Sequence, residues 1–217
     1  MNYLILKCLE QKNIRGHDVS TYYKGTFAAN QIDHLMKFNF KKSKFFSFIV
    51  NTLSTTDSGI GHWLAIIIDY RPQINTLVLR FFDSLGVLTY LHISKFINKI
   101  QEKCKIHQVK YVFDFMKKPL QAPTSKLCGV YVAYCIIKSW RKENTLQELF
   151  KNFKNNRLLN DQKMIKFLYA NWPNKTCHDF AIYSNVKTHI FPRAPPFCPK
   201  CTLDLNTCFD NCKCNQC

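Results

Sequence analysis

The order of apolar and polar residues along the chain predicts several short strands. Four stretches of strand length are rich in β-branched and aromatic residues: 43–53, 62–70, 76–84 and 107–115. The sequence RPQIN separates the second stretch from the third and is typical of a turn. We therefore expect residues 62–70 and 76–84 to pair as neighbouring strands.

Between these strands, apolar residues recur at helical spacing. In residues 89–105 the stripe consists of Leu91, Ile93, Phe96, Ile97 and Ile100. Further helices are expected over residues 1–12, 28–40, 128–140, 146–153 and 160–172, the last with Asn160 or Asp161 as its N-cap. The predicted fold class is α+β, with a small, mainly antiparallel sheet flanked by helices.

A change in composition predicts two regions, a folded domain over residues 1–176 and a linker with a Cys-rich tail over residues 177–217. The Pro-rich sequence FPRAPPFCP leads into the tail. The tail holds six of the eleven cysteines, namely Cys198, Cys201, Cys208, Cys212, Cys214 and Cys217. Their type and spacing favour a small zinc site, for which four of the six would suffice. The alternative is an irregular tail that oxidises or packs on the domain.

The net charge of the chain indicates which classes of molecule it is expected to bind. Lys and Arg number 31 against 14 Asp and Glu, a formal net charge of +17, and the basic residues are spread through the chain. This surplus predicts binding to polyanions, with DNA first, although a basic surface without a partner is the alternative. No apolar run reaches the ~18 residues of a membrane span. We therefore expect an intracellular monomer with no membrane partner.

The sequence QAPTSKLCGVYVAYC, residues 121–135, contains a candidate nucleophile. Cys128 follows a polar, turn-forming run and begins an apolar helix, and a helix N-terminus favours negative charge on a cysteine. Gly129 leaves room for a substrate backbone. The side chain of Gln121 is a candidate donor to an oxyanion beside the Cys128 amide.

His62 is the best candidate for the base, because it opens an apolar strand after the flexible sequence STTDSGIG. The neighbouring strand ends in RFFDSLG, so pairing of the two strands would bring Asp83 near His62 to orient the imidazole. Each residue also has an ordinary explanation: a buried cysteine, a strand-end histidine and a turn aspartate. Together they predict a thiol protease.

The order HW…D…Q…CG resembles the cysteine proteases of the ubiquitin-like-protease clan, which includes the SUMO proteases. Within this clan the chain is most similar to the adenovirus protease (adenain) family. The similarity includes the Gln121–Cys128 loop, FIVNTLS before the histidine, YYKGTF near the start and NDQKMIKFLYANWP as a closing helix. It covers about residues 1–173. The tail has no counterpart in that family.

The resemblance implies roles for four residues. His62 would be the base, Asp83 its partner, Cys128 the nucleophile, and Gln121 with the Cys128 amide the oxyanion hole. The substrates would be viral precursor proteins, cut at Gly-containing sites during virion maturation in the host nucleus and virion. The chemistry would need no cofactor. Adenain is activated by a short viral peptide, and the positive charge of this chain fits DNA as a further cofactor.

The chain departs from the adenain pattern in three ways. The spacing from His62 to Asp83 is longer by a few residues, which implies an enlarged turn between them. The third member is Asp83 in FFDSLG, as in the SUMO proteases, where adenain has a Glu. In adenain, a cysteine upstream of the glutamine forms a disulfide with the activating peptide. The matching position in this chain, counted back from Gln121, is Lys110, and Cys104 is the nearest cysteine. Two alternatives therefore remain: a protease that removes SUMO-like or ubiquitin-like proteins, and a non-catalytic nucleic-acid-binding module.

Overall fold

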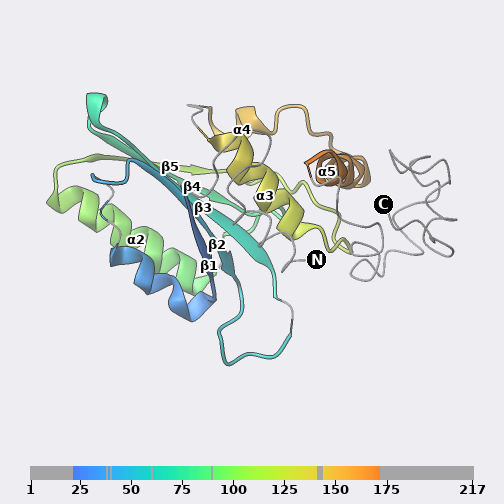
Figure 1. Ribbon diagram of the computed structural model, residues 1–217, viewed down its shortest axis with the longest axis horizontal. Helices are drawn as coiled ribbons and strands as arrows, with labels where there is room; N and C mark the ends of the chain where they lie inside the picture. Colours follow the sequence, from blue (N-terminus) through green and yellow to red (C-terminus); the bar gives the residue numbers. More distant parts are fainter. Residues whose placement is uncertain are drawn as a thin grey trace, which may run out of the picture.

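The sheet at the centre of the molecule has five strands in the order β1-β2-β3-β4-β5 (Figure 1). The computed structural model describes residues 22–37, 39, 41–59, 61–88, 90–140 and 144–171. The strands are β1 (Tyr23–Phe27), β2 (Phe45–Asn51), β3 (Trp63–Arg71), β4 (Thr76–Phe82) and β5 (Lys110–Phe115). Helices pack on both faces of the sheet, which confirms the predicted α+β class.

The sheet is mixed rather than mainly antiparallel. Strands β2, β3 and β4 are antiparallel neighbours, as expected from the turn between β3 and β4. The outer strands β1 and β5 instead run parallel to β2 and β4. Strand β1 was not expected, because its sequence YKGTF contains a glycine and two polar residues. Gly25 has a φ of 118°, which favours glycine, and the pairing register shifts between Tyr23 and Thr26.

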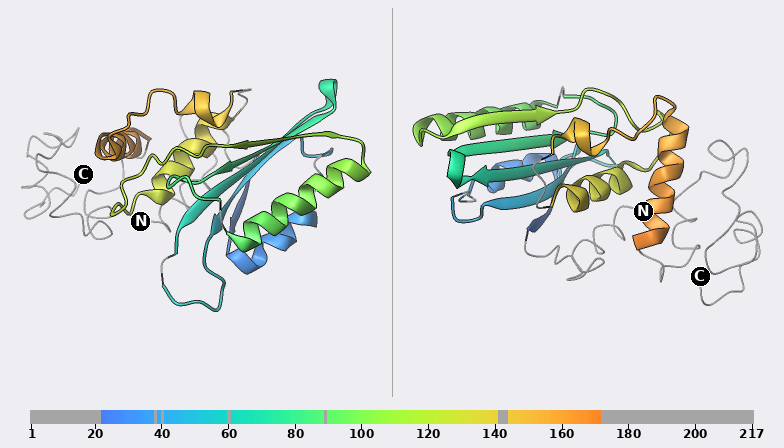
Figure 2. Two further views of the ribbon diagram at one scale, coloured as in Figure 1. Left: turned by 180° about the vertical axis from the view of Figure 1, so that it is seen from behind. Right: turned by 90° about the horizontal axis from the view of Figure 1, so that it is seen from above.

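Two layers of helices cover the sheet (Figure 2). On one face lie η2, a 3-10 helix over Ala29–Lys37, and α2 (Leu91–Ile106). On the other lie α3 (Cys128–Ser139), α4 (Leu146–Leu149) and α5 (Arg157–Asn171). Alternate residues of β3 enter opposite cores: Leu64 and Ile66 face α2, whereas Ala65 faces α3. Burial of both faces explains why these strands are continuously apolar.

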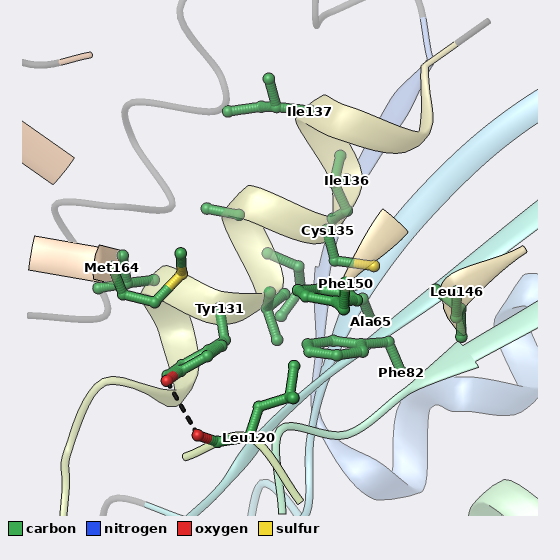
Figure 3. Packing of buried hydrophobic residues seen from close by; sticks show 14 of the residues in the cluster. Ala65, Phe82, Leu120, Tyr131, Cys135, Ile136, Ile137, Leu146, Phe150 and Met164 are labelled. Carbon is green, nitrogen blue, oxygen red and sulfur yellow. Dashed lines mark hydrogen bonds between the residues drawn. The ribbon is translucent and has the colours of Figure 1, made fainter. Parts of the chain in front are cut away.

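The core on the α3 side fixes that helix against the sheet (Figure 3). Phe82 of β4 stacks on Phe150, with ring centroids 4.7 Å apart. From α3 itself, the Tyr131 hydroxyl shares its one hydrogen between the Leu120 carbonyl oxygen at 3.2 Å and Asp161 Oδ1 at 2.8 Å. Because buried cores are closely packed, these contacts hold the first turn of α3 at one edge of the sheet.

Helix α5 begins earlier than the sequence predicted. It starts at Arg157, and Asn156 caps it by accepting from the Leu158 and Leu159 N–H groups at 3.1 and 3.4 Å. Asn160 and Asp161 therefore lie inside the helix, and their prediction as N-caps is wrong. Both side chains are buried and contact the segment that leads to α3.

Several predictions lie outside the described residues. These are the helix over residues 1–12, the domain boundary at residue 176 and the zinc site in the Cys-rich tail. Within the described ranges, no three His, Cys, Asp or Glu side chains are grouped to hold a metal ion. No helix there is both long and apolar enough to cross a membrane.

Candidate active site

His62 and Asp83 meet at one edge of the sheet. His62 immediately precedes β3 and Asp83 immediately follows β4, and because the two strands are antiparallel these ends are adjacent. His62 Nε2 lies 2.7 Å from Asp83 Oδ1, so the imidazole donates to the carboxylate. The backbone of His62 is held by Thr52, whose Oγ1 accepts from the His62 N–H at 2.9 Å. The predicted His62–Asp83 pair is thus formed.

The Asp83 carboxylate is buried and surrounded by donors. Its Oδ1 accepts from the Leu85 N–H at 2.7 Å. Its Oδ2 accepts from the Val87 N–H at 3.2 Å and from the Tyr90 hydroxyl at 3.1 Å. All three groups donate, so they match the acceptor-only carboxylate and fix its position relative to His62.

Cys128 contacts the same imidazole. Burial disfavours the charged form of His62, but hydrogen bonds to Asp83 and Cys128, together with their negative charges, raise its pKa to about 9. Since Nε2 is occupied by Asp83, we infer that Nδ1 faces the sulfur. The histidine thus joins a buried carboxylate to a thiol, the relation that a catalytic base needs.

Cys128 is the first residue of α3, and this end of the helix is uncapped. Leu127 occupies the N-cap position and forms no side-chain hydrogen bond to the first turn. The free N–H groups and the helix dipole therefore favour a negative charge beside Cys128. Cys128 itself is 7% exposed. Its predicted place at the start of a helix is confirmed.

Gln121 is buried seven positions before Cys128, and its carboxamide has fixed partners. The Nε2 group donates to the Ser125 carbonyl at 2.6 Å. The Oε1 atom accepts from the Ser84 hydroxyl at 2.6 Å. An amide nitrogen carries two hydrogens, so the second remains for another acceptor.

Three residues that sequence reasoning did not single out belong to this site. Thr52 holds His62, Tyr90 holds Asp83 and Ser84 holds Gln121. The FIVNTLS segment contains Thr52 and was noted only as a resemblance. Ser84 directly follows Asp83 in FFDSLG, but no sequence signal marks Ser84 or Tyr90.

A cavity of about 220 Å³ opens at the same edge of the sheet. Trp63, which follows His62, lines it together with Phe27 and Leu53. Polar side chains of Asn51 and Asp57 complete its wall. The indole Nε1 of Trp63 is buried and has no hydrogen-bond partner among the described residues.

Cys104, the candidate for an activating-peptide disulfide, lies far from the surface that carries the other predicted residues. Cys104 belongs to α2, on the opposite face of the sheet from Cys128, and is fully buried. Burial raises the pKa of its thiol to about 11, which disfavours the thiolate that disulfide exchange requires. A peptide would reach this sulfur only after α2 had moved.

Comparisons with known proteins found similarity to solved structures. No protein-family model matches the chain, and no curated protein matches it. The "Crystal Structure of ASFV … protease" is 17% identical, with 77% of this chain and 64% of that chain covered and a TM-score of 0.47. A "de-sumoylating protease" is 16% identical, with 78% of each chain covered and a TM-score of 0.37.

A third similar structure is the Rickettsia bellii effector protein RickCE, with 20% identity, 65% of this chain and 50% of that chain covered, and a TM-score of 0.40. The chain spans less than two-thirds of the first three solved chains that it matches: 64%, 42% and 50%. Two of the three structures described are proteases by their printed names. A function for this chain is therefore argued from its own side chains.

Proposed function

We propose that the chain is a cysteine endopeptidase with Cys128 as the nucleophile. The observation that supports this proposal is the position of His62, which bonds Asp83 through Nε2 and contacts Cys128 at the start of α3. Gln121 and the Cys128 N–H are proposed as the oxyanion hole. Each of the four predicted residues would then have a chemical role, and no cofactor is required.

The reaction follows from these positions. With the proton on His62, the Cys128 thiolate attacks the peptide carbonyl carbon, and the carbonyl oxygen becomes an oxyanion. Gln121 Nε2–H and the Cys128 N–H donate to this oxyanion. The imidazolium then protonates the leaving amine, and a thioester remains on Cys128. A water molecule, deprotonated by His62, attacks the thioester and releases the acid and the thiol.

The proposed substrates are viral precursor polypeptides, cut at Gly-containing sites during virion maturation. The cavity beside Trp63 would receive a substrate side chain. The corresponding locations would be the host nucleus and the virion, with the protein acting as a monomer.

Labelling with a Gly-containing peptide vinyl sulfone tests the nucleophile. We expect one adduct at Cys128, because its sulfur adjoins a histidine whose pKa is about 9. Cys104 and Cys135 are internal controls, since both are fully buried and burial raises the pKa of Cys104 to about 11. Mass spectrometry of the digested protein locates the adduct. Labelling elsewhere, with Cys128 unmodified, would refute the assignment.

A deconjugating protease is the second candidate, favoured by the turn after Asp83. In FFDSLG and the valine that follows it, the backbone N–H groups of Leu85 and Val87 donate to this carboxylate. Cleavage of a ubiquitin-like fusion, but not of a Gly-containing precursor peptide, would select this candidate.

We also propose that DNA binds the face that carries α4 and α5. Between residues 115 and 171, the described part exposes eight lysines and one glutamate, Glu148. The lysines are Lys117, Lys118, Lys126, Lys138, Lys151, Lys154, Lys163 and Lys166. Such an excess attracts phosphates and makes binding depend on salt. Substrates bound to the same DNA would then meet the enzyme more often.

Neutralising two lysines on α5 tests the proposed DNA face. The double variant Lys163→Gln, Lys166→Gln should lower the slope of log affinity against log salt by about two, because each lysine neutralises one phosphate. Fluorescence anisotropy with duplex DNA measures the slope. The matched control is Lys95→Gln, Lys99→Gln on α2, across the sheet. Equal effects from both doubles would contradict this location.

A further inference from the structure

Ser84 is fully buried and takes no part in the chemistry described so far. It lies between Asp83, which orients His62, and Leu85, which donates to Asp83. Its contacts are directed to another segment. The Ser84 hydroxyl donates to Gln121 Oε1 at 2.6 Å. Its carbonyl accepts from the N–H groups of Leu120 and Gln121, at 2.8 and 3.0 Å. One residue thus binds both the side chain and the backbone of Gln121.

The orientation of the Gln121 carboxamide matters because its two ends are chemically opposite. Nε2 donates, whereas Oε1 only accepts. The Ser125 carbonyl can only accept, so it must face Nε2. Oε1 therefore faces Ser84, whose hydroxyl can donate. A flipped carboxamide would bring two acceptor oxygens together at Ser125 and would present an oxygen, not an N–H, to the oxyanion.

The turn that carries Ser84 is held against the segment before Gln121. Gly86 has a φ of 72°, and a Cβ at this position would lie 2.4 Å from the Lys117 carbonyl oxygen. Its N–H donates to the Asp83 carbonyl at 3.0 Å. The turn therefore packs closely on residues 117–121, and Ser84 has little freedom to leave Gln121.

From these contacts we infer that Ser84 is a positioning residue for the oxyanion hole. This inference rests on the proposed function. The Ser84 hydroxyl holds Oε1, and the Ser125 carbonyl holds one Nε2 hydrogen. The second Nε2 hydrogen is then directed at the oxyanion without reorganisation during the reaction. One turn would thus orient the base through Asp83 and the oxyanion donor through Ser84.

The substitution Ser84→Ala tests this role. It removes the donor to a buried Oε1, so the carboxamide is no longer held in one orientation. We expect kcat on a peptide substrate to fall about 10- to 100-fold, less than the roughly 100- to 1,000-fold typical for loss of a whole oxyanion donor. KM should change less than about threefold, because the lost interaction acts on the transition state.

Two readouts separate positioning from general damage. In a protein that already carries Gln121→Ala, adding Ser84→Ala should lower kcat less than about twofold, since the effect of Ser84 passes through Gln121. Alkylation of Cys128 by iodoacetamide should proceed at the wild-type rate, because this reaction forms no oxyanion. The inference would be overturned if Ser84→Ala slowed the alkylation of Cys128, or if it lowered kcat equally in the wild type and in Gln121→Ala.

The conservative variant Ser84→Cys shows whether a lower kcat in Ser84→Ala comes from the lost hydrogen bond or from a folding defect. It retains a weak donor of similar shape, so its kcat should lie between those of Ser84→Ala and the wild type. A kcat at or below that of Ser84→Ala would count against the hydrogen bond. Should Ser84→Ala be fully active while Cys128→Ala is inactive, only this inference fails. Should Cys128→Ala be active, the proposed function itself fails.

Discussion

Replacing Cys128 by alanine is expected to abolish peptide cleavage while the chain stays folded. The substitution removes the only atom proposed to attack the carbonyl, and loss of a nucleophile typically lowers kcat at least about 10,000-fold. The side chain is small and stands at the first turn of α3, so the free energy of unfolding should change by no more than about 1–2 kcal/mol. Cleavage of a Gly-containing peptide and thermal unfolding measure the two effects.

The matched control is Cys135→Ala, seven residues further along the same helix. Cys135 is fully buried, and burial holds the pKa of its thiol above the ordinary value. Its loss should lower stability through a small cavity but leave kcat within about twofold. If Cys128→Ala retained processing activity, the non-catalytic nucleic-acid-binding alternative would gain support.

Replacing Asp83 by asparagine should reduce activity and move its pH dependence. The hydrogen bond and charge of Asp83 are leading causes of the raised pKa of His62, about 9. Without the charge, this pKa should fall toward 6.5, and kcat/KM should decline at correspondingly lower pH. By analogy with other triads, the loss at neutral pH should be about 100- to 10,000-fold. The pH profile of kcat/KM measures both effects.

Stability supplies a second readout for the same variant. Because the folded pKa of His62 lies above 6.5, its charged form stabilises the fold fully below about pH 6.5, and this contribution disappears as the pH rises through about 9. Asp83→Asn should weaken that dependence. Tyr90→Phe is the control, since it removes one donor to Asp83 but keeps the charge. If the alkaline limb of the kcat/KM profile were unchanged in Asp83→Asn, this result would contradict the proposed His62–Asp83 pair.

The residues that the sequence predicted stand at the ends of recognisable elements. His62, Asp83 and Cys128 each adjoin an apolar run, and strand pairing brings the ends of β3 and β4 together. Such runs are visible in the sequence because burial on both faces requires them. The α+β class and the His62–Asp83 pair could therefore be predicted.

The remaining features depend on contacts between distant segments. Ser84 and Tyr90 resemble ordinary turn residues until the fold brings them to Gln121 and Asp83. Strand β1 has a mixed sequence because it lies at the edge of the sheet and pairs only with β2. Cys104 is near the expected position in the sequence but out of register, and in the structure it lies in the core between α2 and the sheet. Local patterns contain no information on these placements.

The buried pair on α5 determines how short an active fragment can be. Asn160 Nδ2 donates to the Leu120 carbonyl at 3.1 Å, and Asp161 accepts from the Tyr131 hydroxyl at 2.8 Å and the Ala122 N–H at 3.4 Å. Asn160 and Asp161 thus bind the backbone of the two residues that flank Gln121, Leu120 and Ala122. A truncation that ended after α4 would keep every reacting group and still release the segment that aims the carboxamide. We therefore expect the proposed catalytic unit to extend through α5, the last described helix.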